Sequence, residues 1–269
     1  MAAESIFTAG DDKGVFVPTE HAGGPWDPNA LHGGAAAALI VSELEQLQSE
    51  LQLRFGKLSF ELLRPVPSAP LSLSIELIRA GRRVQEVAAE LRHRDEPVCR
   101  AKALKLQPVQ EGVLEHVATD LMKHPPAPPL PPPDSPNIQT LSGEGPLRAS
   151  FASAVEMRWL TQPWTTGPAK MWMRLHKPVL PGRPISPLAS LAAASDFGNG
   201  VAAELRFDRF LFINADLTVH LWREPRSTWI GLDARTLLEA GGTGVAVNTL
   251  HDLEGPIGSA YQTLVVQGR

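Results

Sequence analysis

The chain has 269 residues, of which 25 are basic and 29 acidic, so its net charge is −4. This charge balance gives no basic field for a nucleic acid or an anionic membrane. The single cysteine, Cys99, excludes an internal disulfide and a cysteine-based zinc site. No apolar run is long enough to span a bilayer, and the N-terminus lacks the pattern of a signal peptide. We therefore expect a cytoplasmic protein.

The first part of the chain, positions 1–108, predicts one helix followed by an antiparallel meander. Residues 1–31 are expected to be irregular, with a short strand near Val15–Val17. The run AAAALIVSELEQLQSEL, residues 35–51, predicts a helix whose first half is apolar nearly all round, which is typical of a core position. Period-2 alternation predicts strands at residues 58–63, 71–77, 84–91 and 98–106.

The same order of elements returns after a proline-rich segment. Residues 124–133 should be extended polyproline II, and the whole stretch 109–148 is expected to be a stiff linker across the surface. The second half predicts a strand at 154–159 and a buried helix of small residues at 185–195. Further strands are expected near residues 217–221, 229–235, 244–250 and 259–266. Exposed sheet residues such as Trp222 and Trp229 favour pairing of subunits into a homo-oligomer.

The two halves align at one constant shift of the sequence, which we name the strand offset. At this offset Leu58–Arg64 falls on Leu217–Arg223, and the turn residue Pro97 falls on Pro256. Such self-similarity indicates a duplicated unit. We therefore predict an α+β double hot-dog. Its two tandem units, 1–108 and 149–269, each have a central helix wrapped by a curved antiparallel sheet.

Three apolar residues of the first half become polar in the second. At the strand offset Ala37 opposes Asp196, Phe55 opposes Asn214, and Ala103 opposes Gln262; the position of Asp196 depends on a helix alignment that can contain a gap. A carboxylate in a buried helix is costly unless it is hydrogen-bonded or used. These polar residues therefore predict a site in the second half.

Strand alternation conflicts with one part of this site. It places Asn214 on the polar face, with Asp216, and not on the face toward the helix. Asn214 can therefore join Asp196 only if a bulge precedes Leu217 or if the site lies at a sheet edge.

The element His32-Gly33-Gly34 begins the first predicted helix. Glycines there expose backbone N–H groups, and these donors and the helix dipole can hold a thioester carbonyl oxygen. Close packing of the helix start against a strand is the alternative explanation. Trp26, in the turn-rich loop before this helix, is assigned to substrate binding with these three residues.

At these residues the sequence resembles the acyl-CoA thioesterase II group of double hot-dog enzymes. The resemblance rests on His32-Gly33-Gly34, Ser195-Asp196-Phe197, the strand from Asn214 to Arg223, and Gln262. In that family an aspartate, a threonine or serine, and a glutamine orient a water for attack on the thioester. Asp196 and Gln262 match their family positions, whereas Asn214 occupies the threonine position and departs from the family pattern.

The resemblance implies a hydrolase of fatty acid metabolism that acts on an acyl-CoA without an acyl-enzyme. In this mechanism Asp196 takes a proton from water, Asn214 and Gln262 fix the water, and amides of Gly33 and Gly34 polarise the carbonyl. The sequence has no Gly-x-Ser-x-Gly element, no metal cluster and no phosphate loop, so we expect no metal and no cofactor.

Two other functions remain open at this point. Asp27-Pro28-Asn29-Ala30-Leu31-His32 partly resembles the signature of hot-dog enoyl-CoA hydratases, in which an aspartate and a histidine add water to a double bond. A non-catalytic acyl-CoA binding protein with a decayed site is the second, supported by the asparagine at position 214. The thioester partner could be coenzyme A or an acyl carrier protein.

Overall fold

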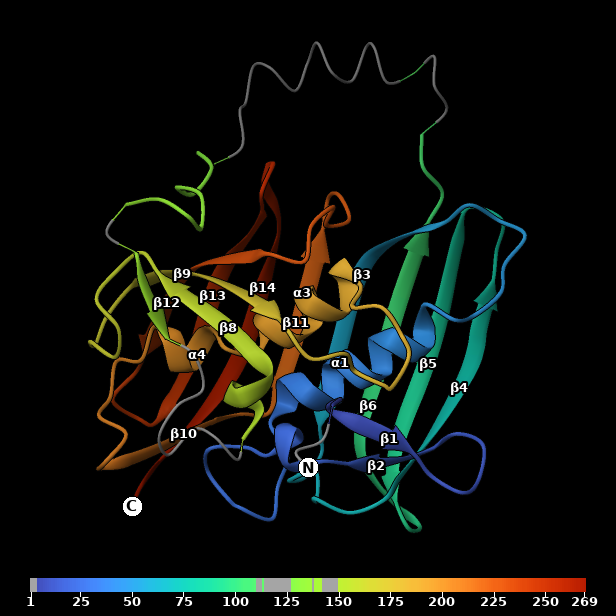
Figure 1. The fold of residues 1–269 in the computed structure, drawn as a ribbon, viewed down its shortest axis with the longest axis horizontal. Helices are drawn as coiled ribbons and strands as arrows, with labels where there is room; N and C mark the ends of the chain where they lie inside the picture. Colours follow the sequence, from blue (N-terminus) through green and yellow to red (C-terminus); the bar gives the residue numbers. More distant parts are fainter. Residues whose placement is uncertain (1–3, 110–112, 114–126, 137, 142–149) are drawn as a thin grey trace.

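The computed structural model describes residues 4–109, 113, 127–136, 138–141 and 150–269 (Figure 1). The elements of the first half are β1 (Phe7–Ala9), β2 (Val15–Pro18), the 3-10 turn η1 (Glu20–Ala22), α1 (Gly33–Leu44), β3 (Arg54–Leu62), β4 (Leu71–Ala80), β5 (Val84–His93) and β6 (Glu96–Leu106). Those that follow are β7 (Gln139–Leu141), η3 (Phe151–Ala154), β8 (Val155–Trp159), β9 (Ala169–Leu175), α3 (Pro187–Ser195), α4 (Gly198–Val201), β10 (Phe210–Asn214), β11 (Asp216–Leu221), β12 (Ile230–Leu238), β13 (Thr243–Asp252) and β14 (Gly255–Gly268).

The described strands form one antiparallel sheet of 14 strands, in which β3 and β11 join the two halves. At this seam Ser59 pairs with Thr218, its own equivalent at the strand offset. The neighbouring pairs exchange equivalents, because Leu58 pairs with Val219 and Phe60 with Leu217. The seam therefore has the symmetry expected of a duplicated unit that meets its own copy.

The hairpin registers repeat at the same offset. Val87 pairs with Ala103 between β5 and β6, and Ala246 pairs with Gln262 between β13 and β14. A bulge follows Leu91 in the first hairpin, and the equivalent bulge follows Leu250 in the second. The predicted strand offset is thus confirmed for these strands.

Helices α1 and α3 lie side by side on one face of the sheet (Figure 1). From Gly34 to Ser42 every residue of α1 is buried, as predicted from its apolar first half. The prediction that this helix continues to residue 51 was wrong, because it ends at Leu44. Residues 46–50 are all exposed, so a longer helix would have had no apolar surface to pack against.

The helices do not follow the strand offset. Their N-caps, His32 and Ser186, lie closer together in the sequence than equivalent strand residues do, and α3 is shorter than α1. The repeat therefore has a gap between helix and sheet, and Asp196 does not stand opposite Ala37. Counting from the N-caps places Asp196 opposite Ser42, near the end of α1.

The described part of the proline-rich segment packs on the second half. The Trp172 indole donates to the Pro131 carbonyl at 2.7 Å, and Leu130 is buried in a cluster with Trp172 and Trp229. The expectation that Trp229 is exposed was therefore wrong, since it is 8 % exposed, whereas Trp222 is 59 % exposed. Residues 114–126 and 142–149 of the predicted linker lie outside the described residues.

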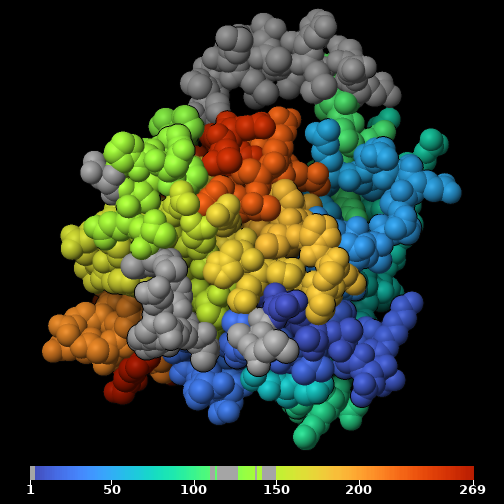
Figure 2. Space-filling view, viewed as in Figure 1, coloured from blue at the N-terminus to red at the C-terminus, as the bar shows by residue number. Residues whose placement is uncertain are grey.

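Short or fully buried strands were missed by pattern reading, above all β9. Most of its residues are buried on both faces, so it has no polar alternation. Phe7 of β1 donates its N–H to the Val179 carbonyl, and Ile6 before it donates to the Pro178 carbonyl, both of which follow β9. In the space-filling view these N-terminal residues (dark blue) adjoin the yellow segment that leads to α3 (Figure 2). No helix in the described part of the chain has the length and apolarity that a membrane crossing needs.

Candidate active site

Asp196 is the C-cap residue of α3, where it meets the start of α1. Its side chain is buried, and three N–H donors and the His32 ring lie within hydrogen-bond distance of it. Oδ2 accepts from the Gly34 N–H at 2.7 Å and lies 2.9 Å from His32 Nδ1. Oδ1 accepts from Asn214 Nδ2 at 2.8 Å and from Gln262 Nε2 at 3.3 Å. The three N–H donors compensate the carboxylate for the water it loses on burial.

Asn214 reaches this carboxylate because the strand is interrupted directly after it. Asn214 pairs with Leu264 and Thr218 pairs with Tyr261, so the register slips by one residue between β10 and β11. Ala215 is the extra residue of this bulge. The bulge turns the Asn214 side chain toward Asp196, which is one of the two conditions that alternation set for Asn214 to join the site.

Gln262 lies on β14 and is fully buried. Besides its contact with the Asp196 carboxylate, Nε2 donates to the Asp196 backbone carbonyl at 3.0 Å. Oε1 accepts from the Asn199 N–H at 3.0 Å. The amide is therefore fixed in orientation from both ends, whereas a glutamine alone in a strand more often faces solvent.

The His32-Gly33-Gly34 element both packs closely against α3 and donates a hydrogen bond to Asp196. A Cβ on Gly33 would lie 2.8 Å from Asp196 Oδ2, and one on Gly34 would lie 2.7 Å from the Ala193 carbonyl. The Gly34 N–H, expected to polarise a substrate carbonyl, donates to Asp196 instead. The Gly33 N–H makes no hydrogen bond to any described residue.

Aromatic rings surround the two ends of this site. The His32 ring stacks on Phe197 with centroids 4.5 Å apart and also contacts Phe151. The His32 Nδ1 accepts from the Gly34 N–H at 3.0 Å as the side-chain cap of α1, and it lies 2.9 Å from Asp196 Oδ2. On the other side, Trp26 packs edge-on against Phe212 at 5.3 Å. Phe212 lies two residues before Asn214 on β10, so Trp26 borders the site without touching Asp196.

Two other reactive side chains, Cys99 and Asp27, make no hydrogen bond to Asp196 among the described residues. Burial raises the pKa of the Cys99 thiol to about 12, and the Asp196 carboxylate adds to the rise. This thiol is therefore a poor nucleophile near neutral pH. Asp27 accepts from the Asn29 N–H at 2.8 Å in an exposed turn. It acts as a turn former there, and its described hydrogen bonds do not join it to His32.

Asn199 is the functional candidate that sequence reasoning missed. The segment Gly198-Asn199-Gly200 looked like a helix end, but it forms the short helix α4 directly after Asp196. Asn199 is buried, donates its N–H to Gln262, and donates its side chain to the Phe212 carbonyl at 3.3 Å. Its one sequence signal was a polar residue between two glycines, which favours a turn.

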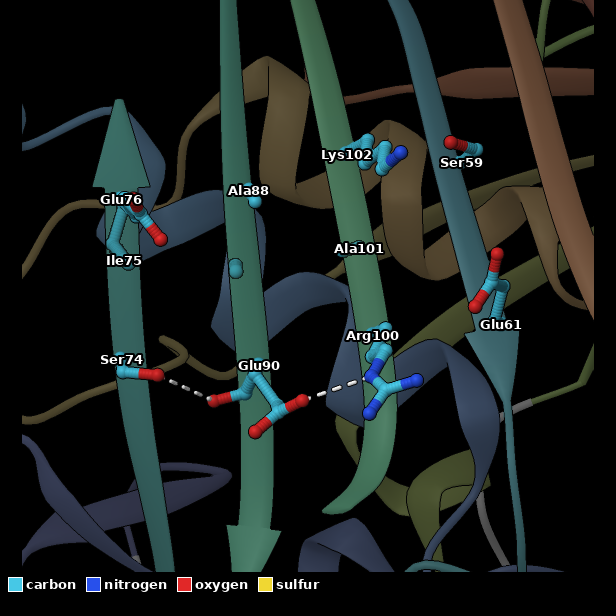
Figure 3. Close-up of a pocket in the computed structure, with 11 residues that line it drawn as sticks. Ser59, Glu61, Ser74, Ile75, Glu76, Ala88, Glu90, Arg100, Ala101 and Lys102 are labelled. Carbon is cyan, nitrogen blue, oxygen red and sulfur yellow. Dashed lines mark hydrogen bonds and ion pairs between the residues drawn. The ribbon is translucent and has the colours of Figure 1, made fainter. Parts of the chain in front are cut away.

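A separate hollow of about 360 Å³ lies on the outer face of the first half (Figure 3). Small and charged side chains line it, and Glu90 bridges Ser74 and Arg100 across its floor. The helices lie behind the strands in this view, so the sheet separates the hollow from Asp196. Within the described residues there is no group of three or more His, Cys, Asp and Glu suited to a metal ion.

Comparisons with known proteins agree with this architecture. Residues 22–105 match the acyl-CoA thioesterase N-terminal domain family, and residues 124–266 match the acyl-CoA thioesterase C-terminal domain family. No curated protein matches the chain.

Several solved structures resemble the chain over nearly its whole length. A conserved protein of unknown function with a hot-dog fold from Alicyclobacillus acidocaldarius has a TM-score of 0.72 and 18 % identity, covering 97 % of this chain and 96 % of that one. An acyl-CoA thioesterase II from Mycobacterium marinum has a TM-score of 0.66 and 14 % identity, covering 97 % and 94 %. The tesB protein of Mycobacterium avium subs paratuberculosis has a TM-score of 0.65 and 19 % identity, covering 96 % and 95 %.

At these identities the structural neighbours establish the hot-dog fold, a large antiparallel sheet with few helices. The activity rests on the two family matches, which together span most of the chain. The chain belongs to the acyl-CoA thioesterase family and is a hydrolase with thioesterase activity.

Proposed function

We propose that the protein hydrolyses acyl-CoA thioesters with a water activated by Asp196, without an acyl-enzyme. The observation that carries the proposal is the convergence of Asn214, Gln262 and the start of α1 on one buried carboxylate. Among the described side chains at this site none is an activated nucleophile, and the high pKa of Cys99 argues against a thiolate.

The attacking water enters between Asp196 Oδ1 and Gln262 Nε2. Their contact is 3.3 Å long, which is the weakest of the four contacts to the carboxylate. The water accepts a hydrogen bond from Gln262 and donates one to Asp196. Asn214 and His32 hold the carboxylate in orientation, and Asn199 holds the glutamine amide.

As the water oxygen bonds to the thioester carbon, one of its protons passes to Asp196. The Gly33 N–H, which the described residues leave unbonded, and the positive end of α1 stabilise the oxyanion. Collapse of the tetrahedral intermediate breaks the carbon–sulfur bond. The thiolate leaves and takes up the proton from Asp196, so the products are the free acid and the CoA thiol.

The proposed architecture is a double hot-dog in which α1 and α3 are the central helices of two units. The repeated registers of β5–β6 and β13–β14 support it. Trp26 and the His32-Gly33-Gly34 element bind the substrate in this proposal. Location in the cytoplasm and assembly into a homo-oligomer stay predictions, and light scattering of the purified protein would measure the second.

Thiol release from a panel of acyl-CoAs tests the proposal, with wild type beside Asp196→Ala and Asp196→Asn. General acid–base catalysis contributes about 10²- to 10⁴-fold, so both variants should lose at least about 10²-fold in kcat. Asp27→Ala is the matched control and should retain activity. Full activity of both Asp196 variants would overturn the mechanism, and loss of thiol release in Asp27→Ala alone would move the hydrolytic site toward Asp27 and His32. No thiol release from any substrate would favour the hydratase or the binding protein, because hydration frees no thiol.

A further inference from the structure

Unpartnered polar atoms lie on the inner face of β12–β14, next to Gln262. Asn248 is 0 % exposed, and both its amide nitrogen and its amide oxygen lack a hydrogen-bond partner among the described residues. Thr236 is also buried, and its hydroxyl has no partner in the same part of the chain. Buried polar groups in native proteins are nearly always hydrogen-bonded, so these two residues require an explanation.

The strand registers place these residues beside the proposed catalytic amide. Ala246 pairs with Gln262 on one side and with Thr236 on the other, so the three form one row across the sheet. Asn248 is two residues further along β13, which makes it a diagonal neighbour of Gln262 at about 7–8 Å. The Asn248 side chain faces α4, because a Cβ on Gly198 would lie 2.1 Å from Asn248 Nδ2. Gly198 follows Asp196 by two residues.

The equivalent strands of the first half hold apolar residues in this row. The inner face of the second half is more polar beside the proposed catalytic carboxylate. At the confirmed strand offset, Asn248 replaces Ala89, Thr236 replaces Leu77, Ala246 replaces Val87, and Ala234 replaces Ile75. Since the two hairpins share one register, this difference is a change of side chains on one backbone plan.

We propose that Asn248 and Thr236 bind the acyl group and select acyl chains that carry a hydroxyl group near the thioester. This inference rests on the proposed thioesterase site. A hydroxyl can accept from Asn248 Nδ2 and donate to Oδ1, whereas a plain methylene leaves both atoms unpaired. The span of about 7–8 Å from Gln262 suits a substituent on the β or γ carbon.

The surroundings also select the charge of the substituent. Gln262 contacts the Asp196 carboxylate, and neither the row of Gln262, Ala246 and Thr236 nor the neighbouring Asn248 supplies a basic side chain. A carboxylate on the acyl chain would therefore meet repulsion without a compensating cation. A neutral hydroxyl is the chemistry that fits these atoms.

The test compares kcat/KM for β-hydroxybutyryl-CoA and γ-hydroxybutyryl-CoA with that for butyryl-CoA. A site that hydrogen-bonds a substrate hydroxyl discriminates strongly against the analogue that lacks it. Wild type should therefore favour one hydroxyacyl substrate by about tenfold or more. Asn248→Leu, which keeps similar volume, should bring the ratio close to one, and Thr236→Val should lower it less.

Each variant is judged by the ratio of its kcat/KM values for two substrates. A general loss of folded or active protein lowers both values equally and leaves the ratio unchanged. Thr249→Val, on the same strand but the opposite face, is the matched control and should keep the wild-type ratio. If Asn248→Leu fails to fold, Thr236→Val decides, since it removes only a hydroxyl. A wild-type ratio near one, or a ratio that neither variant changes, would overturn this inference alone. A folded wild type that releases no thiol from any substrate would overturn the proposed function as well.

Discussion

The two ends of the helix pair form similar junctions with different contents. At one junction Asp196, the C-cap of α3, lies 2.9 Å from His32, the N-cap of α1. At the other, Glu45, the C-cap of α1, accepts from Ser186, the N-cap of α3, at 2.6 Å. Each helix thus ends in an acid that contacts the first residue of its partner.

The difference between these junctions lies in what the strands supply. Beside Asp196 the sheet offers Asn214 and Gln262, whereas the equivalent strand positions near Glu45 hold Phe55 and Ala103. The helix starts differ too, because Gly33 has an N–H to offer and Pro187 has none. In the proposed function, one junction serves chemistry, whereas the Phe55 ring takes the equivalent strand position at the other. We name these the Asp196 junction and the Glu45 junction.

The largest effect should come from alanine substitutions at the two equivalent strand positions, Phe55 and Asn214. Phe55 is buried, so Phe55→Ala should cost about 3–5 kcal/mol in the free energy of unfolding. Asn214→Ala should cost far less stability but lower kcat about tenfold, because Asp196 loses one of its donors. Denaturant titration and thiol release measure the two quantities. Similar stability losses in both variants would contradict the division of labour.

The next effect concerns the backbone at the start of α1. Gly33→Ala places a Cβ 2.8 Å from Asp196 Oδ2, so the carboxylate must move. A displacement of this size should lower kcat by about 10²-fold. Gly200→Ala is the matched control, since its Cβ would meet no atom within 4 Å. Equal activities of the two variants would show that the position of Asp196 does not limit turnover.

This comparison also separates what the sequence could predict from what it could not. Strand alternation is local, so most strands and the strand offset were readable. The asymmetry at Asn214 and Gln262 followed from the same offset and pointed to residues that lie together. Strand β9 gave no such signal because Met171, Trp172 and Met173 are all buried.

Long-range contacts explain the remaining features that the sequence did not predict. The Gly34 N–H donates to Asp196, a partner 162 residues away, and no local pattern reports such a bond. Helix α1 ends at Leu44, and residues 46–50 beyond it are exposed, so its end follows the limit of tertiary burial, which local sequence does not report. Leu130 packs against Trp172 and Trp229, although the prolines around it predicted only a spacer.

A smaller effect should follow from removing the Gln262 amide, which we propose orients the water. Gln262→Ala leaves the buried Asn199 N–H without its acceptor and takes one donor from Asp196. The loss of one such hydrogen bond corresponds to about tenfold in kcat. Gln267→Ala changes an exposed residue of the same strand and should leave kcat unchanged. If Gln262→Ala retains wild-type turnover, the water must be held elsewhere.

The smallest effect belongs to the Glu45 junction and appears as a pH dependence of stability. Burial raises the pKa of Glu45 above its usual value, and its contact with Ser186 only partly offsets the rise. A carboxyl whose pKa is raised by folding contributes stability at low pH, and this contribution is lost as the pH rises through the folded pKa. Glu45→Gln removes the titration while it keeps an acceptor for Ser186.

The Glu45→Gln variant should therefore gain Tm relative to wild type between pH 4 and pH 8, by about 2 °C for a change of about 1 kcal/mol or less. Thermal unfolding across this range measures the gain, and kcat should not change with it, because Glu45 belongs to the junction without the catalytic residues. A Tm difference that is independent of pH would mean that Glu45 acts through packing and not through its charge.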